Sequence, residues 1–179
     1  MAEAFSNSLT RAVGIVTTST SASIGITTNK ITGISTIGIA VSSFIDNSNF
    51  IAGTKVSLIA ASQVVLDRDS TNEAAVSSQT VNTLGVTTVY TSPAATKSIL
   101  IGGTFANNTT SPINLTVEVY DQSTTVGVAI ATKIPVPAGS SFVISDTGKT
   151  LLEANDEIRV YTDSSNAIDV NLSILTGVS

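Results

Sequence analysis

The stretch Ile113-Asn114-Leu115-Thr116-Val117-Glu118-Val119-Tyr120-Asp121 decides the fold class of this chain, because its apolar and polar residues alternate. Successive side chains of an extended strand point to opposite faces, so the four aliphatic residues share one face and the residues between them share the other. The pattern predicts a half-buried β-strand, with Val117 in an apolar layer and Glu118 on a solvated face.

Runs of the same kind continue from residue 85 to the end and predict about eight strands, the spacing typical of an antiparallel β-sandwich or jelly roll. Gly102-Gly103 inside the second run indicates a bulge or a close backbone approach. The apolar residues expected to share a face within each run are Ile99, Ile101 and Phe105; Val126, Val128, Ile130 and Ile134; Phe142 and Ile144; Ile158 and Val160; and Ile168, Val170, Leu172 and Ile174. Turn residues between the runs include Asn107-Asn108, Pro137-Ala138-Gly139, Asp146-Thr147-Gly148 and Asn155-Asp156.

The composition also favours an all-β fold. The 179 residues include 27 Thr and 25 Ser, while only 12% are charged and 4% aromatic. β-Branched residues favour strands over helices. Polar residues interrupt every apolar run, and the first residues lack the basic flank and apolar core of a signal peptide. We therefore expect a soluble protein that is not exported by the general secretory route.

The missing residue types exclude most catalytic chemistry. The chain has no cysteine and no histidine, which removes disulfides, thiolate metal sites and the commonest general base. Its net charge of −5 and scattered basic residues argue against a nucleic-acid surface. The sequence predicts a non-enzymatic protein without catalytic, cofactor-binding or metal-binding residues, and without a nucleic-acid or membrane partner.

Three weak motifs favour ordinary structural roles. Residues 67–73 resemble the start of a calcium loop, but Asn72 and Ser78 stand where the loop needs Gly and a bidentate Glu. The Asn-x-Ser/Thr sequences at Asn107, Asn108, Asn114 and Asn171 are expected to be turn and strand residues. No lysine follows a serine in a Ser-x-x-Lys motif, so the sequence offers no activated serine.

The first part of the chain predicts a small, irregular β module over residues 1–69. Gly-Ile pairs recur at Gly14, Gly25, Gly33 and Gly38 without a fixed period. Between residues 12 and 45 the only charge is Lys30, so we expect this module to mediate self-association and attachment. Residues 70–84 begin like a helix capping box and are expected to form a short helix or an extended linker before a sandwich domain at 85–179.

Three stretches of the first part carry a resemblance to known proteins. Gly38-Ile39-Ala40-Val41, the run from Ile51 to Ile59 around Gly53-Thr54, and Val64-Val65-Leu66-Asp67 resemble a small β module of tailed-bacteriophage tail fibres and other structural proteins. In that module a Gly-Thr turn joins two short strands. A glycine between alternating runs predicts such a turn without the resemblance.

The second part resembles a virion domain of marine and cyanobacterial phages. The residues that carry the likeness lie in 89–94, 99–107, 134–141 and 151–156. The family commonly has Gly where Asn155 stands, a residue that can also adopt a left-handed turn. The resemblance implies a structural component of the particle and supplies no catalytic residues.

These observations lead to one main hypothesis and two alternatives. The chain is expected to be a virion structural protein, a homo-oligomeric and trimeric head decoration or short fibre component that binds other virion proteins. A neck or tail component is the first alternative, and a host-glycan-binding module using Tyr90, Tyr120 or Tyr161 is the second. Attachment is assigned to the N-terminal half. The acidic residues that are expected to form a solvated outer face are Glu118, Asp121, Asp146, Glu153, Asp156, Glu157, Asp163 and Asp169.

Overall fold

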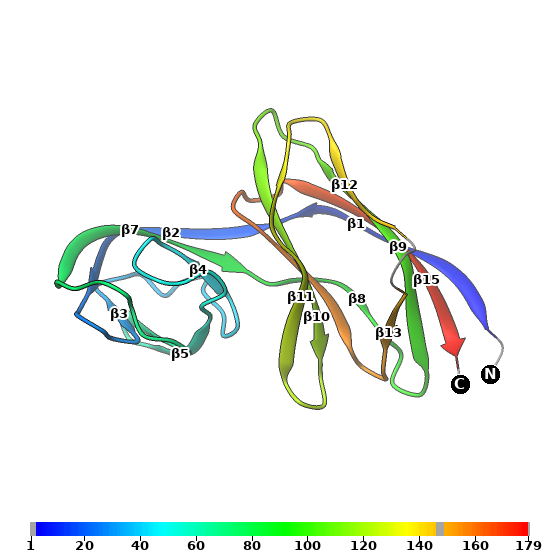
Figure 1. Ribbon diagram of the computed structural model, residues 1–179, viewed down its shortest axis with the longest axis horizontal. Coiled ribbons are helices and arrows are strands. Elements are labelled where there is room, and N and C mark those ends of the chain that lie inside the picture. The colour runs from blue at the N-terminus through cyan, green and yellow to red at the C-terminus, as the bar shows by residue number, and fades with distance from the viewer. Residues whose placement is uncertain (1–2, 146–148, 179) are drawn as a thin grey trace. The chain divides into compact units, whose positions relative to one another are not determined.

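The fold is all-β, as the sequence predicts. A computed structural model describes residues 3–145 and 149–178, and within these ranges the chain forms strands and no helix. No helix that could cross a membrane occurs in the described ranges. The chain divides into two compact units, a discontinuous one of Met1–Gly14 and Thr87–Ser179 and a continuous one of Ile15–Val86 (Figure 1). The turn predicted at Asp146-Thr147-Gly148 lies outside the described residues.

The discontinuous unit is a β-sandwich of two antiparallel sheets. One sheet has the order β1-β15-β9-β12, and β13 also pairs with β9. The other has the order β11-β10-β14-β8. The strands of the first sheet are β1 (Ala4–Val13), β9 (Lys97–Asn107), β12 (Ser141–Ile144), β13 (Thr150–Leu152) and β15 (Ile168–Val178). Those of the second are β8 (Thr87–Thr91), β10 (Ile113–Asp121), β11 (Val126–Val136) and β14 (Glu157–Thr162).

Each of the eight runs predicted between residues 85 and 179 has a strand as its counterpart, whereas jelly-roll connectivity stays a prediction. The sequence did not indicate the ninth strand, β1, which pairs with β15 from Ala4 opposite Thr176 to Val13 opposite Ile168. Residues 85–179 are therefore not a complete sandwich, because its first strand comes from the opposite end of the chain.

The sandwich core lies between the two sheets and follows the predicted alternation in β10, β14 and β15. Ile113, Leu115 and Val117 of β10 are buried in it. All four predicted residues of β15, from Ile168 to Ile174, are buried as well. Because each buried aliphatic side chain contributes about 1.5–3 kcal/mol, these two strands provide much of the stabilisation of the unit.

The predicted face of β9 is wrong because a bulge interrupts this strand. Leu100 and Phe105 are in the core, whereas Ile99 pairs with Leu175 on the outer face. The register shifts between Leu100 and Gly102, so the alternation changes sides at this point. The bulge lies at the predicted glycine pair, where a Cβ on Gly103 would approach Leu172 to 2.7 Å.

The four residues predicted to share a face in β11 differ in burial, because Ile134 packs against the core and the three before it do not. Val126, Val128 and Ile130 are exposed, because β11 is the edge strand of its sheet and its register against β10 shifts twice. At one shift Lys133 adopts a positive φ of 48°, and its backbone N–H donates to Oγ1 of Thr116 at 3.0 Å. The hydroxyl of Thr116 thus accepts from a backbone N–H that the bulge leaves without a partner in the hydrogen-bond ladder between β10 and β11.

The continuous unit is a six-stranded sheet with its own apolar core, in the order β4-β7-β2-β3-β6-β5. Its strands are β2 (Ile15–Ile24), β3 (Lys30–Thr32), β4 (Phe44–Asp46), β5 (Val56–Ala60), β6 (Gln63–Leu66) and β7 (Val76–Gly85). The segment 70–84, expected as a helix or linker, instead contains most of β7, which pairs with β2 from Gly85 opposite Ile15. The module therefore extends past residue 69 and is inserted between β1 and β8 of the sandwich.

The Gly-Thr turn predicted at Gly53-Thr54 is present. Gly53 has a φ of 89°, and the N–H of Thr54 donates to the carbonyl of Ile51 at 3.2 Å. Oγ1 of the buried Thr54 donates to the same carbonyl at 2.8 Å, while its own carbonyl accepts from the N–H of Ile45 at 2.9 Å. The turn therefore fixes the register between β4 and the strand that follows.

Candidate functional site

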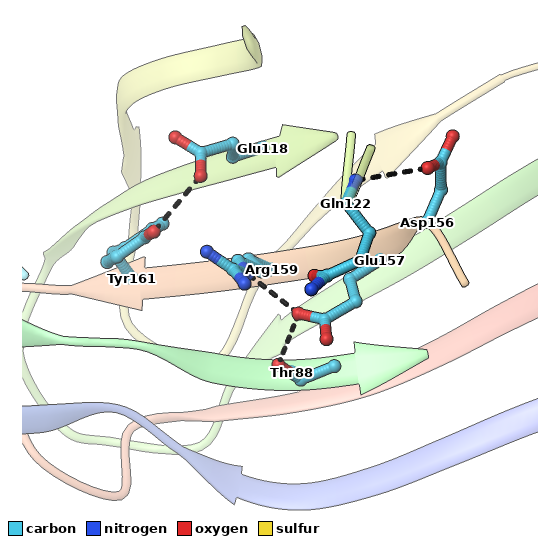
Figure 2. A network of polar contacts seen from close by, with 7 residues as sticks. All are labelled: Thr88, Glu118, Gln122, Asp156, Glu157, Arg159 and Tyr161. Atoms are coloured by element: carbon cyan, nitrogen blue, oxygen red, sulfur yellow. Dashed lines mark hydrogen bonds and ion pairs between the residues drawn. The ribbon is translucent and has the colours of Figure 1, made fainter. Parts of the chain in front are cut away.

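A network of polar side chains lies on the outer face of the sheet formed by β8, β14, β10 and β11. At its centre the phenol of Tyr161 on β14 donates to Oε1 of Glu118 on β10 at 3.1 Å (Figure 2). Glu118 is 1% exposed and Tyr161 is 0% exposed. Gly127 of β11 lies against the carboxylate, since a Cβ at Gly127 would come within 2.2 Å of Cδ of Glu118.

Arg159 extends this cluster along β14. Its Nε forms an ion pair of 2.7 Å with Oε2 of Glu157, and the same oxygen accepts from Oγ1 of Thr88 at 3.1 Å (Figure 2). The guanidinium also stacks on Tyr120, with its Cζ 3.2 Å from the ring centroid. These residues are neighbours on one face of the sheet: Arg159 and Glu157 lie two residues apart on β14, and Tyr120 of β10 is directly opposite Glu157 and therefore diagonal to Arg159.

Burial and neighbouring charge set the proton affinities in the cluster. Burial, followed by the negative charge of Glu118, raises the pKa of Tyr161 above its ordinary value. Burial alone would lower the pKa of Arg159, but the hydrogen bond and charge of Glu157 outweigh it and raise this pKa. Tyr161 is therefore neutral and Arg159 charged at physiological pH.

Two carboxylates organise the turns at one end of this sheet. Asp121 Oδ1 accepts from both the hydroxyl and the N–H of Ser123 and from the N–H of Thr124, and these hydrogen bonds lower the pKa of Asp121 to about 2. Asp156 joins two turns, because its carboxylate accepts from the N–H groups of Gln122 at 3.2 Å and Glu153 at 2.9 Å. Asn155 beside it has a φ of 68°, which confirms the predicted left-handed turn.

The cluster combines an acid, a phenol and a guanidinium, but its geometry favours a structural role. A general acid or base must reach the proton that it transfers, and the central pair is enclosed by the strands themselves. Surface hollows of about 350 to 520 Å³ lie elsewhere and are lined by other residues. We therefore interpret these contacts as a polar layer that ties β8, β14 and β10 together.

The weak motifs of the sequence have structural roles. Asp67, which begins the calcium-like segment, accepts from the N–H of Lys55 at 2.8 Å, and Asn72 donates its amide to the carbonyl of Gly25 at 3.0 Å. No group of three or more acidic residues within the described ranges is arranged to hold a metal ion. Asn107 is buried and donates its amide to three backbone carbonyls, those of Ser111, Val136 and Pro137.

The three tyrosines considered as sugar platforms are all engaged within the sandwich. Tyr161 is buried, and Arg159 covers one face of Tyr120. Tyr90 packs against the core, and its hydroxyl lies 2.9 Å from Oγ of Ser98.

Two of the eight acidic residues expected on a solvated outer face do not belong to it. Glu118 and Asp156 are buried acceptors, and Asp146 lies outside the described residues. Alternation did not indicate the Glu118 cluster, because a glutamate at an outward position of an alternating strand normally predicts exposure. The only related signal was Gly127, whose missing side chain leaves space for the carboxylate.

Comparison of the chain with protein-family models, with curated proteins and with solved structures finds no match in any of the three.

Proposed function

We propose that this chain is a non-enzymatic structural protein of a tailed-bacteriophage virion, where it assembles as a homo-oligomer and serves as a head decoration or short fibre component. The proposal begins from the resemblance of residues 33–73 and 89–156 to phage structural modules. It is consistent with an all-β chain in which the clustered charged side chains tie strands together rather than line an open hollow.

One observation carries the proposal furthest: apolar side chains are exposed on both units. On the sandwich they are Phe5, Leu9, Val126, Val128, Ile130, Val143 and Leu151. On the inserted module they are Ile15, Ile26, Ile37, Val41, Ile51 and Leu58. Where exposed apolar side chains adjoin, they form the kind of patch through which a protein packs against another protein.

We assign attachment to the inserted module and solvent exposure to the sandwich. Within the module, Lys30 is the only charged residue from 15 to 45, so the module offers hydroxyl and aliphatic groups suited to packing on a protein surface. The sandwich contains most of the acidic residues, although Glu118 and Asp156 do not contribute to its surface.

The test uses particles that lack this protein. The full chain should bind them at saturable occupancy, and a variant in which a short Gly-Ser linker replaces residues 15–86 should not. This variant keeps β1 in the sandwich, so failure to bind cannot be attributed to an incomplete sheet. Full binding by the variant would place attachment in the sandwich, and no binding by the full chain would refute the virion assignment.

The alternatives remain open to direct measurement. Immunogold labelling of intact particles distinguishes a head decoration from a neck or tail component. A glycan array tests the sugar-binding alternative, which the engaged positions of Tyr90, Tyr120 and Tyr161 disfavour.

A further inference from the structure

The first strand of the sandwich leaves one edge open. β15 pairs along one side of β1, and no described strand pairs along the other (Figure 1). Natural edge strands are usually blocked by proline, by charge or by a bulge. From Ala4 to Thr10 this strand has neither proline nor charge, and its register shift lies beyond, between Thr10 and Val13.

The side chains of β1 have an unusual distribution for a sandwich strand. Phe5 and Leu9 are on the outer face and are 77% and 72% exposed, respectively. Leu9 forms one wall of a shallow hollow of about 380 Å³ on this face, together with Thr104 and Ala106 of β9. The inner face instead carries hydroxyls, and Oγ of Ser8 donates to the carbonyl of Val89 at 2.8 Å.

The sequence around Asn7 is self-complementary. Phe5 and Leu9 lie two residues on either side of Asn7, and Glu3 and Arg11 lie four residues on either side. All four are exposed. In an antiparallel pair of identical strands centred on Asn7, Phe5 therefore faces Leu9 of the other copy, and Glu3 faces Arg11.

We propose that two copies of the chain pair antiparallel through β1, about a two-fold axis at Asn7, so that their five-stranded sheets become one continuous sheet. This inference rests on the homo-oligomer of the proposed function, and it makes the basic assembly unit a dimer in place of the trimer expected from the sequence. Edge-to-edge pairing of this kind satisfies backbone N–H and C=O groups that are otherwise left to water.

The choice of register follows from the side chains. A two-fold axis that relates two neighbouring antiparallel strands is normal to the sheet and keeps each side chain on its own face. Because directly opposite residues also share a face, one residue must lie opposite its own copy, and the axis passes between these two copies. An axis through Ser6 would place Leu9 opposite Glu3, and an axis through Ser8 would place Phe5 opposite Arg11. Only the axis through Asn7 matches the apolar pair and the opposite charges together.

The apolar pairs provide most of the stabilisation. Aromatic–aliphatic cross-strand pairs stabilise a sheet relative to pairs of small residues, and the two-fold symmetry provides two of them. The two exposed Glu3–Arg11 pairs add less, because solvent screens them, and they act mainly on register.

The first experiment is disulfide trapping in the full chain, which has no native cysteine. Residues directly opposite each other have Cβ atoms about 4.5–5.5 Å apart, close to the span of a disulfide. Asn7→Cys should form a covalent dimer under mild oxidation. Asn171→Cys is the matched control, because Asn171 is also exposed on the outer face but lies one strand further in, opposite Leu9.

A charge exchange tests the register. Glu3→Arg and Arg11→Glu should each weaken dimerisation about tenfold at low salt, because each variant brings like charges together twice. The double variant should regain the dimer. A mixture of the two single variants should form heterodimers, since each then meets its opposite charge.

The outcomes separate this inference from the proposed function. Pairing through β1 would be refuted if the chain forms oligomers but Asn7→Cys gives no more covalent dimer than Asn171→Cys. It would also be refuted if the charge exchange does not change dimerisation. Either result would leave self-association intact. A chain that stays monomeric at every concentration in sedimentation would refute both the pairing and the oligomer. Neither result bears on particle binding, which is measured separately.

Discussion

The phenol of Tyr161 donates a hydrogen bond of 3.1 Å to the carboxylate of Glu118, and both side chains are buried on a face that the sequence assigned to solvent. Strands β14 and β10 bring them together, with Thr116 directly opposite Tyr161 and Glu118 opposite Arg159. A carboxylate enclosed in this way requires its donors, because a buried charge that loses a partner retains the cost of desolvation.

Replacing Tyr161 by phenylalanine should therefore lower the free energy of unfolding by about 1–3 kcal/mol, as expected when a buried charged acceptor loses a donor. Urea denaturation at neutral pH measures the change. Tyr90→Phe is a suitable control, because it removes only the contact with the hydroxyl of Ser98. Equal losses in the two variants would contradict a special role for the Glu118 contact.

Stability should also fall at alkaline pH. Burial first, and Glu118 second, raise the pKa of Tyr161 above the value of about 10 that a tyrosine has in an unfolded chain. The contribution of this group is fully present below pH 10 and decreases as the pH rises toward the folded-state pKa, because only the unfolded tyrosine ionises in that interval. Urea denaturation between pH 8 and 11 should show a smaller decline for Tyr161→Phe than for the native chain. Parallel declines would show that Tyr161 does not ionise on unfolding in this range.

Two Val→Asp substitutions compare the core with the sheet edge. Val117 is 0% exposed and Val128 is 62% exposed. Val117→Asp should cost several kcal/mol, because it places a carboxylate among aliphatic side chains. Val128→Asp should change stability by less than about 0.5 kcal/mol. Thermal melting of both variants checks the order, and the reverse order would mean that β11 and not β10 supplies the core.

The continuous unit should fold by itself. Ile15 and Gly85 are opposite residues of β2 and β7, so the ends of the insertion are adjacent. Residues 15–86 should unfold cooperatively in isolation, and so should residues 1–14 joined to 87–179 by a short linker. The fragment 87–179 without β1 should be less stable than the joined protein, because it loses Val13 and every contact of β1 with β15. Equal melting temperatures would show that β1 is dispensable.

The Gly53 turn offers a local test of the inserted module. Gly53→Ala should destabilise this unit by about 1–2 kcal/mol, because an L-residue is strained at a φ of 89°. Gly25→Ala is the matched control, since Gly25 is not in the left-handed region and its nearest neighbour would be 3.4 Å from a new Cβ. Hydrogen exchange of the Thr54 amide reports the change directly, and similar effects of the two substitutions would contradict it.

Local alternation predicted much of the sandwich from the sequence. The alternate apolar residues from Ile113 to Val117 and from Ile168 to Ile174 are buried, as their period of two indicates. The prediction failed at Ile99, because the bulge before Gly102 changes the face of the strand and periodicity cannot count an extra residue. It did not indicate the exposure of Val128, because edge position depends on the order of strands in the sheet.

The polar cluster and the first strand were missed for a related reason. Burial of Glu118 depends on Gly127 and Tyr161, which come from two other strands. The placement of β1 depends on β15, 157 residues away at the contact between Ala12 and Asp169. In both cases a partner distant in the sequence, rather than the local pattern, determines where the residue lies.

The pairing of β1 with β15 also sets the order of events during synthesis. The inserted module is complete once residue 86 has left the ribosome, but β1 has no sheet to join until β15 has been made. During that interval the strand with exposed Phe5 and Leu9 is an unpaired segment on a growing chain, where aggregation competes with folding. Closure of the sandwich is therefore the last step, and the long sequence separation of its partners makes it a slow one.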